Sequence, residues 1–252
     1  MFNSPILGYN SKEGIVYQFW ANRDSHDVNY FDPKTDYAPT TAISSISWDD
    51  PNFPNIEGFG VWAAKCNFTM GPDGKMYSRM LGGNLVRIDV ENARGENLTN
   101  GDLVGTKDGS AYGLVFDPQD ENVFYFSNND KHCIYKYDLR TKEWACWAGQ
   151  EGKSGYLDGP IGQAMFNKPG QMCVDSEGNI ILTDTENHCI RKITMSTGYV
   201  STLAGKPQNS GYVNGSAEDA QFKKPLGICI DNDDVMYIGD SENRAIRRLA
   251  VE

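Results

Sequence analysis

The amino-acid sequence predicts an all-β protein built from repeated small sheets, and three observations carry this prediction. Residues 155–205 recur almost at once with a constant shift of 56 residues. The first copy contains four short runs rich in β-branched residues, as at 179–183 (NIILT) and 188–194 (HCIRKIT). Turn-forming segments such as DSEGN (175–179) separate these runs. A shift that holds across a whole unit indicates a repeat architecture.

The repeat includes glycine, aromatic, acidic and basic positions. In its first half the matched pairs are Gly155/Gly211, Tyr156/Tyr212, Asp158/Asn214, Gly159/Gly215, Ala164/Ala220, Phe166/Phe222 and Pro169/Pro225. In its second half they are Cys173/Cys229, Asp175/Asp231, Asp184/Asp240, Glu186/Glu242, Asn187/Asn243, Ile190/Ile246 and Arg191/Arg247. A sheet of four short antiparallel strands cannot bury both of its faces alone. Radial stacking of such sheets hides these faces, so we expect a β-propeller of four-stranded blades.

A short segment before each set of strands fits this architecture. It reads Ala164-x-Phe166-x-x-Pro169 in the first copy. Alanine allows two blades to approach closely, phenylalanine fills the wedge between them, and proline begins the innermost strand, where no ladder donor is needed. We therefore expect Phe166 and Phe222 to be buried between blades.

These residues carry a family resemblance. Residues 155–205 resemble the NHL repeat, named for Asn-His-Leu positions that here read Asn187-His188-Cys189. The similar segments are GYLDG, AMFNKPG, DSEGN, DTENHCIRKI and GYVSTLAG. The resemblance implies a propeller, usually six-bladed, and it implies no single function. The chain also resembles NHL proteins of gut Bacteroidota, which are often exported lipoproteins with an immunoglobulin-like TIG module upstream. Neither that module nor the lipid-anchor cysteine occurs in this sequence.

Five blades are recognisable, and we interpret residues 1–252 as one propeller domain. Their approximate bounds are 4–47, 62–106, 110–149, 167–205 and 223–251. In the fourth and fifth blades, we expect 171–175 and 227–231 to line the channel and 199–203 to lie on the rim. The fifth blade ends after three strands. This predicts either a longer parent chain with a sixth blade or closure of the fifth blade by SPILGY (4–9).

Composition limits the classes of function. The chain has 252 residues, 39% of them apolar, which suffices for one large all-β domain. The formal net charge of -11 opposes phosphate backbones and anionic membranes, so we expect no nucleic-acid partner. No apolar run approaches the roughly 18 residues of a membrane span. The start, MFNSPILGYN, has neither a basic leader nor an apolar signal-peptide core. We therefore expect either a cytoplasmic protein or a leader outside this sequence.

The six cysteines form neither a CxxC pair nor a metal-finger spacing. Cys173 and Cys229 occupy one repeat position, and Cys133 and Cys189 occupy another. Equivalent places on neighbouring blades lie farther apart than the about 7 Å between Cα atoms that a disulfide allows. We interpret the cysteines as small buried residues.

We expect ligands on the face where the loops joining outer to inner strands meet the loops joining second to third strands. Propellers bind ligands at the channel mouth, and loops on a rigid scaffold carry function. The candidate ligand-binding residues are Tyr156, Asp158, Lys168, His188, Tyr212, Asn214, Lys223, Arg244, His132 and Arg79. Aromatic and charged side chains mixed in this way can stack on sugar rings or hold a peptide. Asp184 and Asp240 recur by blade, so we interpret them as hydrogen-bonded braces of the hairpins.

A metal site is the alternative use of this face. His132 and His188 occupy equivalent positions on adjacent blades, and converging histidines can bind zinc, as the resemblance to NHL amidating lyases implies. Arg244 replaces the histidine in the next blade, so the position tolerates a cation that cannot ligate metal. Asp158 gives one carboxylate per loop, far short of the six to eight oxygens of a calcium site. We expect no metal and no cofactor, with each histidine hydrogen-bonded within its own blade.

The sequence leaves three functional hypotheses. It contains no GxSxG elbow, HExxH motif or glycine-rich phosphate loop, so nothing identifies a nucleophile. The leading hypothesis is a monomeric, non-catalytic propeller that binds a small molecule, glycan or protein; the resemblance implies a periplasmic or cell-surface role. The second is a metal-dependent lyase or hydrolase built on His132, His188 and a channel carboxylate. The third, the RNA-binding NHL class, needs a basic face, which the net charge opposes.

Overall fold

The structure is a computed structural model of the 252-residue chain. The residues that it describes are 6–10, 15–21, 26–36, 38–43, 47–48, 68–79, 84–99 and 113–250. The chain divides into two compact units, Met1–Ser110 and Ala111–Glu252. We call them the first and the second unit and describe each by itself.

The described residues of the first unit form two sheets. One has the order β1-β2-β3-β4 with antiparallel pairs throughout. Its elements are β1 (Ile6–Asn10), β2 (Ile15–Ala21), β3 (His26–Phe31), the 3-10 turn η1 (Pro33–Thr35) and β4 (Pro39–Ile43). The other has the order β5-β9-β8-β7-β6. Its strands are β5 (Ser47–Trp48), β6 (Thr69–Met70), β7 (Met76–Arg79), β8 (Leu85–Asp89) and β9 (Arg94–Asn97). The two-residue β5 pairs in parallel with β9, a contact that the sequence did not indicate.

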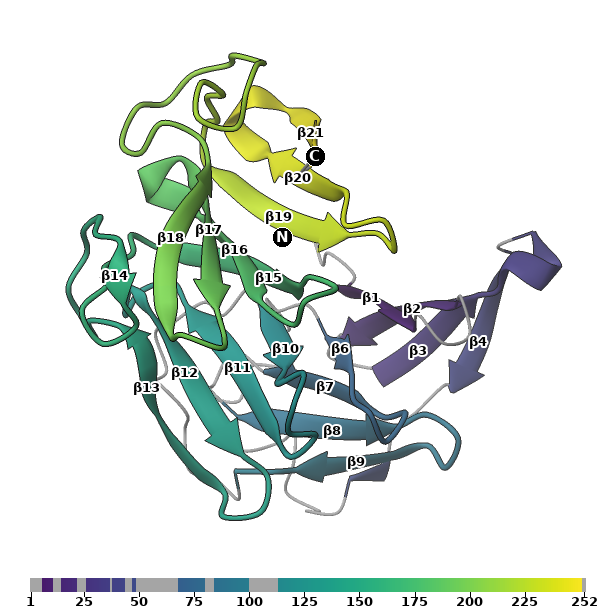
Figure 1. Cartoon of the computed structure of the whole chain (residues 1–252). Helices are drawn as coiled ribbons and strands as arrows, with labels where there is room; N and C mark the ends of the chain where they lie inside the picture. Colours follow the sequence, from purple (N-terminus) through teal and green to yellow (C-terminus); the bar gives the residue numbers. More distant parts are fainter. Residues whose placement is uncertain are drawn as a thin grey trace. The chain divides into compact units, whose positions relative to one another are not determined.

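The second unit contains three sheets (Figure 1). The first has the order β10-β11-β12-β13 and consists of β10 (Leu114–Phe116), β11 (Val123–Asn128), β12 (Cys133–Asp138) and β13 (Glu143–Gly149). The next has the order β14-β18-β17-β16-β15 and consists of β14 (Gly159–Pro160), β15 (Pro169–Val174), β16 (Ile180–Asp184), β17 (Cys189–Thr194) and β18 (Tyr199–Ala204). The last has the order β19-β20-β21 and consists of β19 (Pro225–Ile230), β20 (Met236–Asp240) and β21 (Ala245–Leu249). We call these the third, fourth and fifth sheets.

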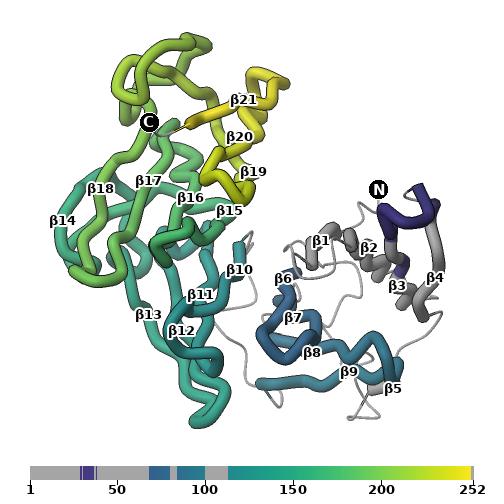
Figure 2. Tube along the Cα trace, turned by 45° about the vertical axis from the view of Figure 1, so that its right-hand side comes forward, coloured from purple at the N-terminus to yellow at the C-terminus, as the bar shows by residue number. Residues whose placement is uncertain are grey.

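The strand order agrees with the predicted blade. In the fourth sheet, β15 forms one edge, whereas β18 lies on the opposite side, covered only by the short β14. The edge strands β10, β15 and β19 contact one another in turn (Figures 1 and 2). Residues 171–175 and 227–231 therefore fall on or directly after the inner strands, and 199–203 belong to the outer strand, as expected. One-turn 3-10 helices, η2 (Thr185–Asn187) and η3 (Ser241–Asn243), join the second and third strands of the last two sheets.

Two hydrophobic clusters hold the three sheets together. One joins the third and fourth sheets and includes Phe166, and the other joins the fourth and fifth sheets and includes Phe222. Both rings are almost fully buried, which confirms the predicted wedges. Gly149 is the last residue of β13, Gly205 directly follows β18, and both have positive φ. A Cβ atom at either position would meet the wedge ring within 3.1 Å. Glycine is thus required where each phenylalanine enters.

Two further sequence expectations concern cysteines and membranes. The five cysteines in the described residues are free, and Cys133 and Cys189 are buried, whereas Cys229 is exposed. Cys66 lies outside the described residues. Among the described helices, which are single 3-10 turns, none has the length and apolar composition needed to cross a bilayer.

Candidate functional site

The loop face of the second unit is built on a buried aspartate in each repeat. The Asp184 carboxylate accepts hydrogen bonds from the Asn167 backbone N–H (2.7 Å), the Asn187 side chain (2.8 Å) and the Arg191 guanidinium (2.7 Å). These bonds tie the end of β16 to the next strand and to the segment that enters the blade. The aspartate therefore braces the hairpin, as the sequence indicated.

The fifth sheet repeats this brace with the same geometry. Asp240 accepts hydrogen bonds from the Lys223 backbone N–H (2.6 Å), the Asn243 side chain (2.8 Å) and Arg247 (2.9 Å). Lys223 was predicted as a ligand-binding residue, and its backbone is part of the brace. Its side chain remains half-exposed and pairs with Glu242 (3.5 Å).

The second guanidinium nitrogen of each arginine binds the preceding Gly-Tyr-x-Asp/Asn-Gly loop. In the fourth sheet, Arg191 donates to the Asp158 carboxylate (2.7 Å) and to the Leu157 carbonyl (2.9 Å). In the fifth, Arg247 donates to the Asn214 side chain (2.7 Å) and to the Val213 carbonyl (2.7 Å). Asp158 and Asn214 thus hold the arginine, a structural role that the sequence did not indicate.

Each arginine is also enclosed between two aromatic rings. The Arg191 guanidinium carbon lies 4.9 Å from the centre of the Tyr156 ring and 5.1 Å from that of Phe166. Arg247 lies 4.9 Å from Tyr212 and 5.0 Å from Phe222. A cation over an aromatic face is attractive, more so when it is shielded from water. We call these arrangements the Phe-Arg-Tyr stacks. They fix two tyrosines at equivalent places, and Tyr212 is 61% exposed.

The two histidines connect neighbouring blades. His132 Nδ1 accepts a hydrogen bond from the backbone N–H of Lys168 (3.1 Å), and His188 Nδ1 accepts one from Lys224 (3.2 Å). Each donor is 36 residues ahead and begins the next sheet. The expectation of bonds within one blade was therefore wrong. Lys168 and Lys224 have φ of 56° and 49° and precede a proline, a backbone position that is strained for a lysine.

This geometry fixes the tautomer of both imidazoles. A backbone N–H is always a donor, so Nδ1 must be the acceptor, and the proton of the neutral ring resides on Nε2. A histidine that binds metal through Nε2 normally donates its other ring N–H to a partner. The observed bonds oppose that arrangement. In the part of the chain that the structure describes, His, Cys, Asp and Glu side chains form no group of three suited to a metal ion.

Charged side chains continue along the same face. Lys224 Nζ pairs with Glu186 (3.4 Å) and Glu242 (3.1 Å), and these carboxylates hold its pKa above the ordinary lysine value. The predicted ligand-binding residues include Lys223 and not Lys224, although the 56-residue shift from Lys168 indicates Lys224. Arg244 replaces the histidine and ends η3 with φ of 52°.

Burial shifts the pKa of Asp184 and that of His132 on this face. Desolvation raises the pKa of Asp184 to about 6 and outweighs the opposing effect of Arg191. Desolvation, aided by Lys168, lowers the pKa of His132 below its ordinary value. Both shifts thus come mainly from the removal of the side chains from water, and the hydrogen bonds that Asp184 accepts act in the opposite direction. Arg79, the remaining predicted site residue, is buried in β7 of the first unit.

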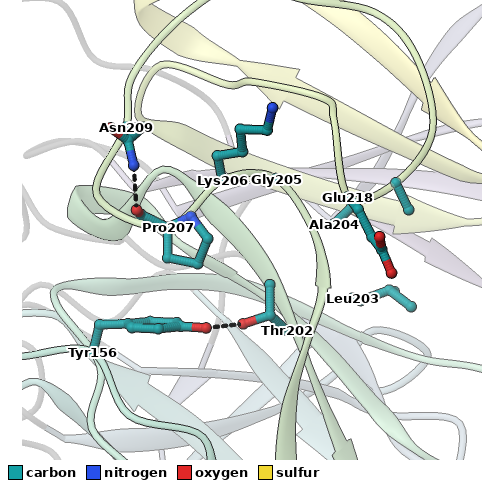
Figure 3. Close-up of a pocket in the computed structure, with 10 residues that line it drawn as sticks. Tyr156, Thr202, Leu203, Ala204, Gly205, Lys206, Pro207, Asn209 and Glu218 are labelled. Atoms are coloured by element: carbon teal, nitrogen blue, oxygen red, sulfur yellow. Dashed lines mark hydrogen bonds between the residues drawn. The ribbon is translucent and has the colours of Figure 1, made fainter.

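A pocket of about 440 Å³ opens beside Tyr156 (Figure 3). It is lined by Tyr156, Thr202, Leu203, Ala204, Gly205, Lys206, Pro207, Asn209, Ala217 and Glu218. The Tyr156 hydroxyl is hydrogen-bonded to Thr202 Oγ1 (2.7 Å), and the Asn209 side chain donates to the Pro207 carbonyl (3.0 Å). Apart from Tyr156, none of these residues was among the predicted site residues.

The sequence matches known proteins in its repeats. The model of the NHL repeat matches residues 166–193. The chloroplastic protein SUPPRESSOR OF QUENCHING 1 of Arabidopsis thaliana is 25% identical over 268 residues, which cover 98% of this chain and 25% of that protein. NHL repeat-containing protein 2 of Gallus gallus is 30% identical over 152 residues, which cover 60% of this chain and 19% of that protein. The chain thus spans a quarter or less of these relatives.

Solved structures show the same fold. A protein of unknown function from Bacteroides thetaiotaomicron superposes with a TM-score of 0.80 at 23% identity, covering 98% of this chain and 58% of that one. An auxiliary nutrient binding protein from the same organism has a TM-score of 0.64 at 24% identity, covering 99% and 69%. Virginiamycin B lyase from Staphylococcus aureus has a TM-score of 0.57 at 14% identity, covering 99% and 70%. The chain therefore has an all-β propeller fold like that of these Bacteroides proteins, and its residues 166–193 match the NHL repeat.

Proposed function

We propose that this NHL-repeat β-propeller protein is a non-catalytic binding module whose ligand lies on the loop face of the second unit. The observation that carries the proposal is the pair of Phe-Arg-Tyr stacks. Each stack holds a tyrosine in one orientation before any ligand arrives, which lowers the entropic cost of binding. Tyr212 presents its ring to solvent, and Tyr156 lines a pocket. Rigid aromatic side chains of this kind are typical centres of binding sites.

The surroundings of these tyrosines favour a glycan as the ligand. A sugar ring offers an apolar C–H face to an aromatic ring and hydroxyl groups to the charged residues nearby. Lys168, His188, Lys223, Arg244 and His132 supply polar groups on the same loops. One structural neighbour is an auxiliary nutrient binding protein, which agrees with a binding role. At 24% identity, this likeness concerns the fold alone. A periplasmic or cell-surface location, as implied by the resemblance to Bacteroidota proteins, completes the proposal.

An enzymatic role finds less support in these residues. The carboxylates of Asp184 and Asp240 accept the hydrogen bonds of the braces, and the Asp158 carboxylate is bound to Arg191. The two histidines use Nδ1 as an acceptor, which opposes metal ligation through Nε2. The alternative, a metal-dependent lyase or hydrolase, requires these histidines to bind a metal ion. Elemental analysis of protein purified without chelator tests it: one metal per chain that disappears in a His132→Ala, His188→Ala double variant would replace our proposal.

A glycan panel tests the binding function. We expect immobilised oligosaccharides to retain the protein and Tyr212→Ala to weaken the best binder by about tenfold, or about 1.4 kcal/mol. Tyr199→Ala is the matched control, because Tyr199 is 47% exposed on the outer strand β18, away from the stacks. Equal losses in both variants, or no retention by any glycan, would contradict the glycan proposal.

A further inference from the structure

The pocket beside Tyr156 differs from the open platform of Tyr212 and has its own chemistry. We propose that it is a subsite for one neutral pyranose ring, with the apolar face of the sugar on the Tyr156 ring. This inference rests on the proposed binding function and specifies the ligand class. A volume of about 440 Å³ lies in the usual range of small-molecule sites, about 300–1,000 Å³.

The pocket lies where the repeat is broken by smaller side chains. Leu203 and Ala217 line it, and the equivalent residues one repeat earlier are Trp147 and Ile161. The alignment is structural as well, because Gly149 N–H donates to the Ile161 carbonyl (2.9 Å), as Gly205 does to that of Ala217 (2.8 Å). Trp147 and Ile161 pack against their hydrophobic cluster. Residues that recur serve the repeat. Two large-to-small differences that create space therefore point to a specific use.

Tyr156 is fixed from two sides. Its hydroxyl is bonded to Thr202, and Arg191 lies against its ring, held in turn by Asp158 and Asp184. Figure 3 shows the ring and Pro207 on one side of the pocket and Glu218 on the other. A ring held in this way is preorganised for stacking, so little conformational entropy is lost when a flat apolar surface binds.

The polar groups of the pocket select among ligands with an apolar face. The Glu218 carboxylate is exposed and makes no hydrogen bond or ion pair with any described residue. Asn209 donates to Pro207, which leaves its side-chain oxygen as an acceptor, and Lys206 pairs with Asp219 (3.2 Å). Acceptors thus predominate, and they suit a ligand with several hydroxyl donors.

The same groups disfavour two other ligand classes. A ligand carboxylate would be repelled by Glu218 and by the net charge of -11. A purely apolar ligand would desolvate Glu218 without giving it a hydrogen bond, which is unfavourable. A neutral pyranose has no carboxylate for Glu218 to repel, and its hydroxyl groups can donate hydrogen bonds to Glu218.

Nuclear magnetic resonance titration tests the subsite with defined probes. The probes are the methyl pyranosides of glucose, galactose and mannose, and methyl glucuronide as the acidic counterpart. We expect at least one neutral probe to shift the backbone amides of Thr202, Gly205 and Ala217, with a dissociation constant of about 1 mM, as typical ligand efficiencies give for about a dozen heavy atoms. Methyl glucuronide should bind more weakly than the neutral probes, and Glu218→Gln should reduce this difference in affinity.

Two variants establish the location of the binding. Ala217→Ile grafts the residue of the preceding repeat and should weaken the neutral probe about tenfold or more by filling the pocket. Leu203→Trp does the same from the other wall, so one poorly folded variant does not decide the result. Unaltered affinity in a folded variant, or shifts confined to residues around Tyr212, would overturn the subsite and leave the binding function intact. No shift with any neutral probe would also overturn the subsite, and the oligosaccharide panel then judges the binding function separately.

Discussion

The fourth and fifth sheets carry the same motif, yet equivalent side chains differ widely in exposure. Ile190 in β17 is fully buried, whereas Ile246 at the same place in β21 is 79% exposed. Ile181 and Tyr237 show the same trend, with 0% and 39% exposure. The braces, by contrast, are nearly identical, with Arg-to-Asp distances of 2.7 and 2.9 Å.

The difference separates two levels of organisation. The hydrogen bonds of the brace join loops that belong to one repeat, so each copy forms them alone. The burial of Ile190 comes from the next sheet, since its cluster contains Phe222 and Ile228. Variants that remove either a packing contact between sheets or a hydrogen bond within one repeat therefore test the two levels separately.

The largest effect is expected at the wedge. Phe166→Ala should lower the free energy of unfolding by about 3–5 kcal/mol, because the enclosed ring leaves a cavity. Phe222→Ala should fall at the lower end of that range, since its cluster contains fewer buried residues. Urea unfolding measures both. A loss below about 1 kcal/mol for Phe166→Ala would contradict the wedge assignment.

The brace comes next. Asp184→Ala should cost about 3–4 kcal/mol, because it removes the buried carboxylate that pairs with the fully buried Arg191 and leaves only the partly exposed Asp158 as its ion-pair partner. Asp240→Ala should cost less, since Arg247 is 8% exposed and water reaches it more easily. A double-mutant cycle of Asp184→Ala with Arg191→Met isolates the coupling by chemical denaturation. Additive losses would show that the pair does not act as a unit.

The isoleucine pair tests the comparison most directly. Ile190→Ala should cost about 2–4 kcal/mol, as for other buried aliphatic truncations. Ile246→Ala should change stability by less than about 0.5 kcal/mol, because its side chain is already in water. Thermal and urea unfolding of the two variants give the values. Similar losses at both positions would mean that Ile246 is covered in solution.

The smallest effect concerns pH. The folded protein lowers the pKa of His132, so it favours the neutral ring, which accepts the Lys168 N–H. The resulting stabilisation, about 1 kcal/mol, should be complete above the unfolded pKa of about 6.5 and disappear as pH falls through the lower folded value. Comparing the wild type with His132→Ala at several pH values measures it. A difference that grows on acidification would refute the assigned bond.

The architecture of the repeated part could be predicted from the amino-acid sequence. The constant 56-residue shift, the β-branched runs and the turn segments specified the strands and their order, and the Ala-x-Phe-x-x-Pro segment specified Phe166 and Phe222 as wedges. Asp184 and Asp240 were also identified as braces. These features were accessible because strand propensity, turns and burial at a repeat position are encoded within one unit of about 56 residues.

The roles of the loop-face side chains, by contrast, became visible in the tertiary contacts. Asp158 meets Arg191 across 33 residues, and His132 meets Lys168 across 36 residues. The same residue types are equally consistent with a ligand, so the sequence assigned Asp158 and Asn214 to binding. The pocket beside Tyr156 likewise depends on how Leu203 and Ala217 pack where the preceding repeat has Trp147 and Ile161. Contacts between loops far apart in sequence follow from how blades stack, and no local pattern of residues encodes that geometry.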